Sequence, residues 1–63
     1  MKEHDVVVLI EAIPEGYLKI GDEGTIVHIY PSGKLFEVEF KHDKYNKSRV
    51  LTLMQHQLKL KEI

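Results

Sequence analysis

The sequence predicts an all-β fold, a small sheet of five strands that curls into a barrel. Its clearest stretch, residues 35–40 (LFEVEF), alternates apolar residues with glutamates, as in a strand with one buried and one wet face. Residues 25–30 (TIVHIY) are β-branched or aromatic at five of six positions. Between these strands, Pro31 suits the first corner of a type I turn, and Gly33 can adopt the positive φ that closes a bulged hairpin.

Residues 5–10 form the first expected strand, because they end in an uninterrupted apolar run. Such a run predicts cover on both faces and a central place in the sheet. Residues 11–20 are expected to form a long loop, since Pro14 and Gly16 exclude a regular element. The loop is more apolar than a solvent loop needs, so we expect it to fold back on the core and to leave an exposed apolar patch. The residues expected to contact a protein partner there are Ile13, Tyr17 and Leu18.

The second half of the chain supplies the remaining strands. Residues 41–48 are polar and turn-forming, which predicts the distal loop of a second hairpin. Residues 49–53 alternate as a fourth strand, 54–57 suit one turn of 3₁₀ helix, and 58–61 alternate again as a short last strand with both leucines inward. A long first loop, a three-stranded meander and a 3₁₀ turn before the last strand make the plan of an SH3-like barrel. The alternative is an open five-stranded β-sandwich fragment that dimerises.

The length allows one domain, residues 1–63, with a compact core. A chain of this size buries only about 60% of the surface that its unfolded form exposes. The residues expected in the core are Val7, Leu9, Val27, Ile29, Phe36, Val38, Phe40, Leu51, Leu53 and Leu58.

Composition narrows the classes of function. The chain has no cysteine, which excludes a disulfide framework and thiolate chemistry and fits a reducing, cytoplasmic setting. The longest apolar run, five residues, is too short to span a bilayer, so we expect no membrane association. The net charge of −1 is uneven: residues 1–40 carry three lysines and eight acids, net −5, and residues 41–63 carry six basic residues and two acids, net +4.

The titratable side chains form no recognisable catalytic or metal-binding pattern. The four histidines fall in four different expected elements, without the spacing that metal sites favour, and His28 is expected to be half-buried in its strand. Glu37 and Glu39 share one outward face and are most simply solvated. Ser32 and Ser48 lie in turns without a base at predictable reach. We therefore expect no enzyme activity, no cofactor and no metal.

The basic segment, residues 41–49, suggests an alternative function. The segment combines several cationic residues with one aromatic residue. In small barrels, cationic side chains of this kind bind nucleic-acid phosphates and an aromatic ring stacks on a base. The simpler interpretation is a solubilising loop. The residues concerned are Lys41, Lys44, Tyr45, Lys47 and Arg49.

The chain also resembles a known bacterial family. The likeness is carried by residues 5–9 (DVVVL), 18–30 (LKIGDEGTIVHIY), 36–40 (FEVEF) and the pair Gln57-Leu58. These are similar to small single-domain proteins, common in cyanobacteria, that are grouped as a domain of unknown function. The resemblance implies an SH3-like barrel, distantly similar to KOW-type modules and to the barrel of nitrile hydratase β subunits, and it implies no catalytic residues. Members are often encoded beside another small protein, which implies one half of a two-protein cassette, such as an antitoxin or immunity partner.

Together these observations predict a non-enzymatic binding module, a monomer or a homodimer, that presents its first loop to another protein. The alternative is a nucleic-acid-binding, KOW-like module that uses residues 41–49.

Overall fold

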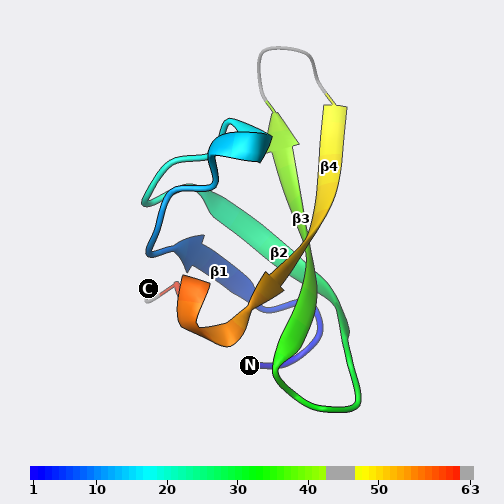
Figure 1. Cartoon of the computed structure of the whole chain (residues 1–63). Helices are drawn as coiled ribbons and strands as arrows, with labels where there is room; N and C mark the ends of the chain where they lie inside the picture. Colours follow the sequence, from blue (N-terminus) through cyan, green and yellow to red (C-terminus); the bar gives the residue numbers. More distant parts are fainter. Residues whose placement is uncertain (43–46, 62–63) are drawn as a thin grey trace.

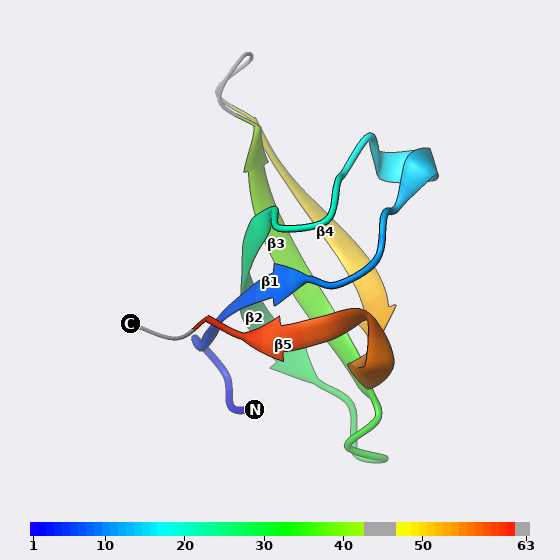
Figure 2. The same cartoon turned by 90° about the vertical axis from the view of Figure 1, so that its left-hand side faces the viewer.

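A computed structural model describes residues 1–42 and 47–61, without the side chains of residues 42 and 47. Five strands form one antiparallel sheet in the order β4-β3-β2-β1-β5, which curls on itself (Figures 1 and 2). This confirms the predicted all-β fold class, with its long first loop and its 3₁₀ turn before the last strand. The elements are β1 (Val6–Leu9), η1 (Pro14–Gly16), β2 (Glu23–Ile29), β3 (Leu35–His42), β4 (Lys47–Met54), η2 (Gln55–Gln57) and β5 (Leu58–Leu60).

The turn between β2 and β3 forms where the sequence predicts it. Gly33 has a φ of 74°, and its N–H donates to the Tyr30 carbonyl at 2.8 Å. The Tyr30 N–H in turn donates to the Leu35 carbonyl at 3.0 Å and closes the hairpin. Most residues with a side chain are strained at this φ, so glycine is favoured here.

A β-bulge in β2 changes which of its residues face the core. Ile26 pairs with Val38, but His28 pairs with Glu37, so Val27 is the extra residue on its strand. The expected core position of Val27 is therefore wrong: its side chain is 39% exposed, whereas Ile26 is fully buried.

The core otherwise agrees closely with the expected set. Ile29 and Leu51 lie at its margin, partly buried. Gly24 lies against it, and a Cβ there would come within 2.6 Å of Val38 Cγ1, so β2 and β3 pack closely only because position 24 has no side chain. The buried residues are Val7, Leu9, Ile26, Phe36, Val38, Phe40, Leu53 and Leu58.

The expectation that both faces of the first strand are covered is wrong. β1 does lie inside the sheet, between β2 and β5, but only one of its faces is covered: Val6 is 42% exposed and Ile10, just after the strand, 44%. Leu60 pairs with buried Val7 and so faces the concave side as expected, but it lies on the edge strand β5 and remains 45% exposed. A single curled sheet has one concave face to bury, and among the described residues no second layer covers the convex face.

Candidate functional site

The first loop leaves β1 and is closed by a two-way bridge between Ile13 and Leu18. The Ile13 N–H donates to the Leu18 carbonyl at 3.0 Å, and the Leu18 N–H donates to the Ile13 carbonyl at 3.1 Å. Between them Pro14–Gly16 forms the single 3₁₀ turn η1, so the expectation that no regular element forms here is wrong. Proline is tolerated because it occupies the first helical position, where its missing N–H would have no helical partner.

The loop is fixed to the barrel by packing and by one long-range hydrogen bond. Ile13 and Leu18 are partly buried and pack against the core. Gly16 is buried, and a Cβ there would lie 3.1 Å from Leu51 Cδ1. Arg49 Nη1 donates to the Gly16 carbonyl at 3.2 Å, which ties the loop to β4. Two of the three expected contact residues thus serve mainly to hold the loop in place.

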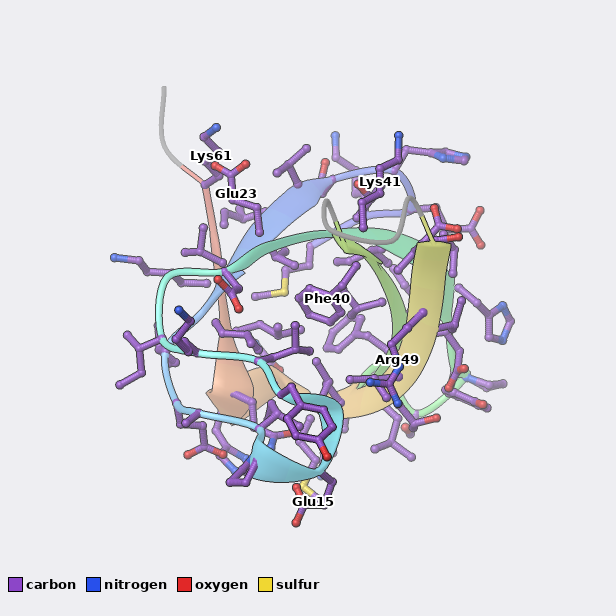
Figure 3. All side chains as sticks on the ribbon, turned by 90° about the horizontal axis from the view of Figure 1, so that it is seen from above. Glu15, Glu23, Phe40, Lys41, Arg49 and Lys61 are labelled. Carbon is purple, nitrogen blue, oxygen red and sulfur yellow. The ribbon has the colours of Figure 1, made fainter. Side chains whose placement is uncertain are left out.

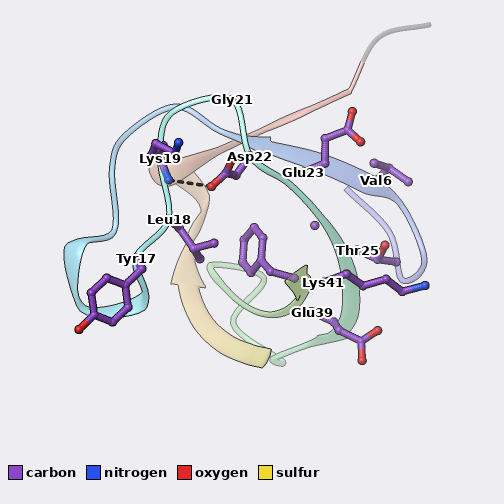
Figure 4. A pocket seen from close by; sticks show the side chains of 12 residues that line it. Val6, Tyr17, Leu18, Lys19, Gly21, Asp22, Glu23, Thr25, Glu39 and Lys41 are labelled. Atoms are coloured by element: carbon purple, nitrogen blue, oxygen red, sulfur yellow. Dashed lines mark hydrogen bonds between the residues drawn. The ribbon is translucent and has the colours of Figure 1, made fainter. Parts of the chain in front are cut away.

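Tyr17, the third, is held outward. Its backbone is left-handed (φ 57°, ψ 34°), and its N–H donates to the Pro14 carbonyl at 3.1 Å. Its side chain is 80% exposed. Figure 4 shows Leu18 pointing into the neighbouring hollow, whereas Tyr17 lies at the margin of the hollow with its ring turned outward. A bulky residue rarely adopts positive φ, and such strain persists where the surrounding structure imposes it, often at functional positions.

An open hollow lies beside the loop, at the barrel end where β2 begins and β3 ends (Figure 4). Its floor includes Gly24 and Phe40, and its rim carries charges of both signs, among them Glu39 and Lys41. Asp22 Oδ2 accepts the N–H of Lys19 at 2.8 Å and holds the loop's return. The hollow is therefore a shallow, mixed surface beside Tyr17 rather than an enclosed catalytic pocket.

Ile20 is a candidate contact residue that the sequence interpretation missed. It is 69% exposed on the same loop. The sequence did contain a signal for it: Ile20 is an apolar residue directly before a glycine turn. An apolar residue at such a position is expected to be covered, either by the chain itself or by a partner.

The structure tests only part of the basic segment. Lys41 is exposed at the end of β3, and Arg49 is exposed but bonded to Gly16. Arg49 pairs across the hairpin with buried Phe40, so it projects from the concave side, whereas Lys41, the next residue along β3, projects from the other. Figure 3 shows the two cations well apart. Lys44, Tyr45 and the side chain of Lys47 lie outside the described residues.

A polar cluster ties β2, β3 and β4 together on the convex face. Tyr30 Oη donates to Glu37 Oε1 at 3.0 Å, and Thr52 Oγ1 donates to the same oxygen. The hydrogen bond to Glu37, with partial burial and the negative charge of that carboxylate, raises the pKa of Tyr30 above its ordinary value. His28 stands edge-on to Tyr30, with ring centroids 5.0 Å apart, but it is exposed, so the expected half-buried histidine is wrong.

No group of side chains within residues 1–41 and 48–61 is arranged to hold a metal ion. In the same part of the chain, no helix has the length and apolar character to cross a membrane.

Comparison with known proteins gives one result. A family model described as "Domain of unknown function (DUF4926)" matches residues 3–60, so the chain belongs to this family. The expected membership of a family of unknown function is confirmed. No curated protein and no solved structure matched the chain.

Proposed function

Starting from this family membership, we propose that the protein is a non-enzymatic binding module that holds a protein partner through its first loop, with Tyr17 as the central contact. The observation that carries the proposal is the 80% exposure of an aromatic side chain on a backbone held at positive φ. Tyrosine is among the residues most enriched at the energetic centres of protein interfaces.

The loop supports this role because its conformation is fixed before any partner arrives. The Ile13–Leu18 bridge closes its base, and the Arg49 hydrogen bond holds its tip to β4. Binding through a preformed loop avoids the entropy cost of ordering a mobile segment. Tyr17 itself has only two side-chain torsions to fix, so it offers a large contact area at low entropic cost.

The hollow beside the loop would receive a side chain of the partner. Its apolar floor at Phe40 and its charged rim suit an amphipathic contact. We further propose, from the family resemblance, that the partner is a small protein encoded beside this one in a bacterium, as in an antitoxin or immunity pair, and that both are cytoplasmic. The same resemblance suggests a relationship to SH3-like and KOW barrels.

Nucleic-acid binding through residues 41–49 is the alternative, and the described residues favour it less. The Arg49 guanidinium donates to the Gly16 carbonyl, and Glu37 and Glu39 lie on the convex side of the strand that leads into the segment. Their charges would repel a phosphate backbone that crossed the sheet.

The test is co-purification from the native host with wild-type protein, Tyr17→Gly and the control Val27→Ala, which trims an exposed side chain on the convex face. Mass spectrometry identifies the partner, and calorimetry with purified partner measures affinity. We expect Tyr17→Gly to weaken binding by about 2 kcal/mol, roughly thirtyfold, because a central aromatic contact is lost. We expect Val27→Ala to bind as wild type does. Equal affinity for Tyr17→Gly and wild type would contradict the proposal.

Titration of labelled single-stranded oligonucleotides at two salt concentrations tests the alternative. We expect a Kd weaker than about 10⁻⁵ M at physiological salt. Sub-micromolar affinity with a log–log salt slope of about −3, lost in Lys44→Glu with Lys47→Glu, would replace the protein-partner proposal with the nucleic-acid one.

A further inference from the structure

The two edges of the sheet differ in a way that bears on self-association. The β5 edge is three residues long and carries Lys59, followed by Lys61, which pairs with Glu23. Short, charged edges resist pairing with another chain. The β4 edge is eight residues long, and the side chains of its convex face at Ser48, Val50 and Thr52 are all exposed and uncharged.

The backbone of β4 presents free hydrogen-bonding groups on that edge. The Gln55 N–H donates to the Lys34 carbonyl, toward β3, whereas the Met54 N–H points away from β3 and donates to Gln57 Oε1 at 2.8 Å. Backbone direction alternates along a strand, so the N–H and C=O of Thr52, Val50 and Ser48 also point to the outer edge. Within the described ranges, no backbone group of a loop or turn bonds to these three residues.

The outer edge is accessible as well as free. The loop around η1 meets β4 through the side chains of Arg49 and Leu51, whose β3 partners Phe40 and Val38 are buried, so these contacts lie on the concave side. In Figure 1 the upper half of β4 has no ribbon on the side away from β3.

We propose that two copies of the chain pair β4 against β4, antiparallel, about a two-fold axis at Val50. The free run ends at Thr52, because the Met54 N–H is already taken by Gln57, and Val50 is its midpoint from Ser48. This register places Val50 opposite the partner's Val50 and Ser48 opposite the partner's Thr52. Each of these pairs would exchange two backbone hydrogen bonds across the edge.

The balance of charges beside β4 supports a second copy as the occupant. Lys41 lies beside Ser48 in the hairpin, and Glu37 lies beside Thr52. The proposed register therefore puts Lys41 of one copy in the same cross-strand row as the partner's Glu37, with only the small side chains of Ser48 and Thr52 between them. The two-fold symmetry repeats this row on the other side of the axis. The central row sets Glu39 of one copy and the partner's Glu39 on either side of the two valines, so one like-charged pair opposes the two opposite-charged pairs.

The area involved predicts a weak dimer. One added strand pair buries less surface than the roughly 1,200 Å² of a stable standard interface. The surface is separate from Tyr17, so this proposal does not depend on the proposed function.

Sedimentation equilibrium of the whole chain across concentrations up to about 1 mM tests the proposal. We expect the average mass to rise with concentration toward that of a dimer. Val50→Lys should weaken the dimer about fivefold or more, because it sets like charges opposite each other. Val27→Lys places the same charge on another exposed valine of the convex face and should leave association unchanged. A monomer at every concentration, or association equally strong in Val50→Lys, would overturn the proposal.

The register has its own test, because the natural chain has no cysteine and every disulfide reports an introduced site. A mixture of Ser48→Cys and Thr52→Cys should form mixed disulfide dimers faster than either variant alone. Preferential coupling of Thr52→Cys to itself, or no preference at all, would reject the axis at Val50.

Discussion

Tyr17 and Tyr30 show how one residue type takes two roles in a chain of this size. Tyr30 is partly buried, donates to Glu37 and carries His28 edge-on against its ring. Tyr17 is 80% exposed at positive φ, and its hydroxyl has no protein partner among the described residues. The first belongs to a hydrogen-bonded cluster with residues of β3 and β4, whereas the second costs backbone strain and makes no side-chain hydrogen bond among the described residues.

The comparison shows that residue type alone does not distinguish a structural position from a binding position. The distinguishing feature is whether the side chain makes its contacts within the chain. The Tyr30 hydroxyl donates to Glu37 of β3, which also accepts from Thr52 of β4, and the ring of Tyr30 contacts His28 of β2. Tyr17 stands on a loop fastened through its neighbours Gly16 and Leu18 while its own side chain points outward. A preformed binding surface requires a loop of fixed conformation that leaves an aromatic side chain available for a partner.

The largest expected effect comes from removing the support that both regions share. Phe40 is 3% exposed, lines the floor of the hollow beside the loop and packs close to Gly24 of β2. Phe40→Ala should cost about 3 to 5 kcal/mol, which a domain this small cannot lose, so circular dichroism should show a mostly unfolded chain. Val38→Ala deletes less volume from the same strand and should still melt cooperatively. A native-like melt for Phe40→Ala would mean that the two regions do not depend on a common core.

A pair of variants separates the two tyrosines directly. Tyr30→Phe removes the hydrogen bond to Glu37 and should lower the free energy of unfolding. Tyr17→Gly relieves the strain of positive φ and should leave stability unchanged or raise it by up to about 1 kcal/mol. Urea denaturation measures both. A clear loss of stability in Tyr17→Gly would show that the side chain packs within the chain and would weaken its assignment as a contact for a partner.

Much of the fold was predictable because its signals are local. The alternation in residues 35–40 and the Pro31 and Gly33 positions specify a strand and a turn without reference to the rest of the chain. The bulge at Val27 was not predictable, since it depends on how β2 must bend to follow β3 around the barrel. Its effect was to exchange Val27 for Ile26 in the core.

The candidate site was predictable only in part. The excess of apolar residues marked the loop, but three apolar residues could not reveal which two would pack inward and which one would remain exposed. The hydrogen bond from Arg49 to Gly16 joins residues 33 apart and exists only once the barrel has closed. Arg49 therefore looked like part of a basic surface when, in the structure, it holds the loop.

The smallest expected effect is a pH dependence that Tyr30 should confer. Its pKa is raised in the folded protein, chiefly by the hydrogen bond to Glu37, so the neutral phenol is favoured by folding. The stabilisation is fully present below the unfolded value of about 10 and is lost as pH rises through the higher folded pKa. Free energies of unfolding measured between about pH 8 and pH 11 should fall more steeply for the wild type than for Tyr30→Phe. Equal slopes for Tyr30→Phe and wild type would mean that the Tyr30–Glu37 bond does not persist in solution, and the contrast between the two tyrosines would then rest on exposure alone.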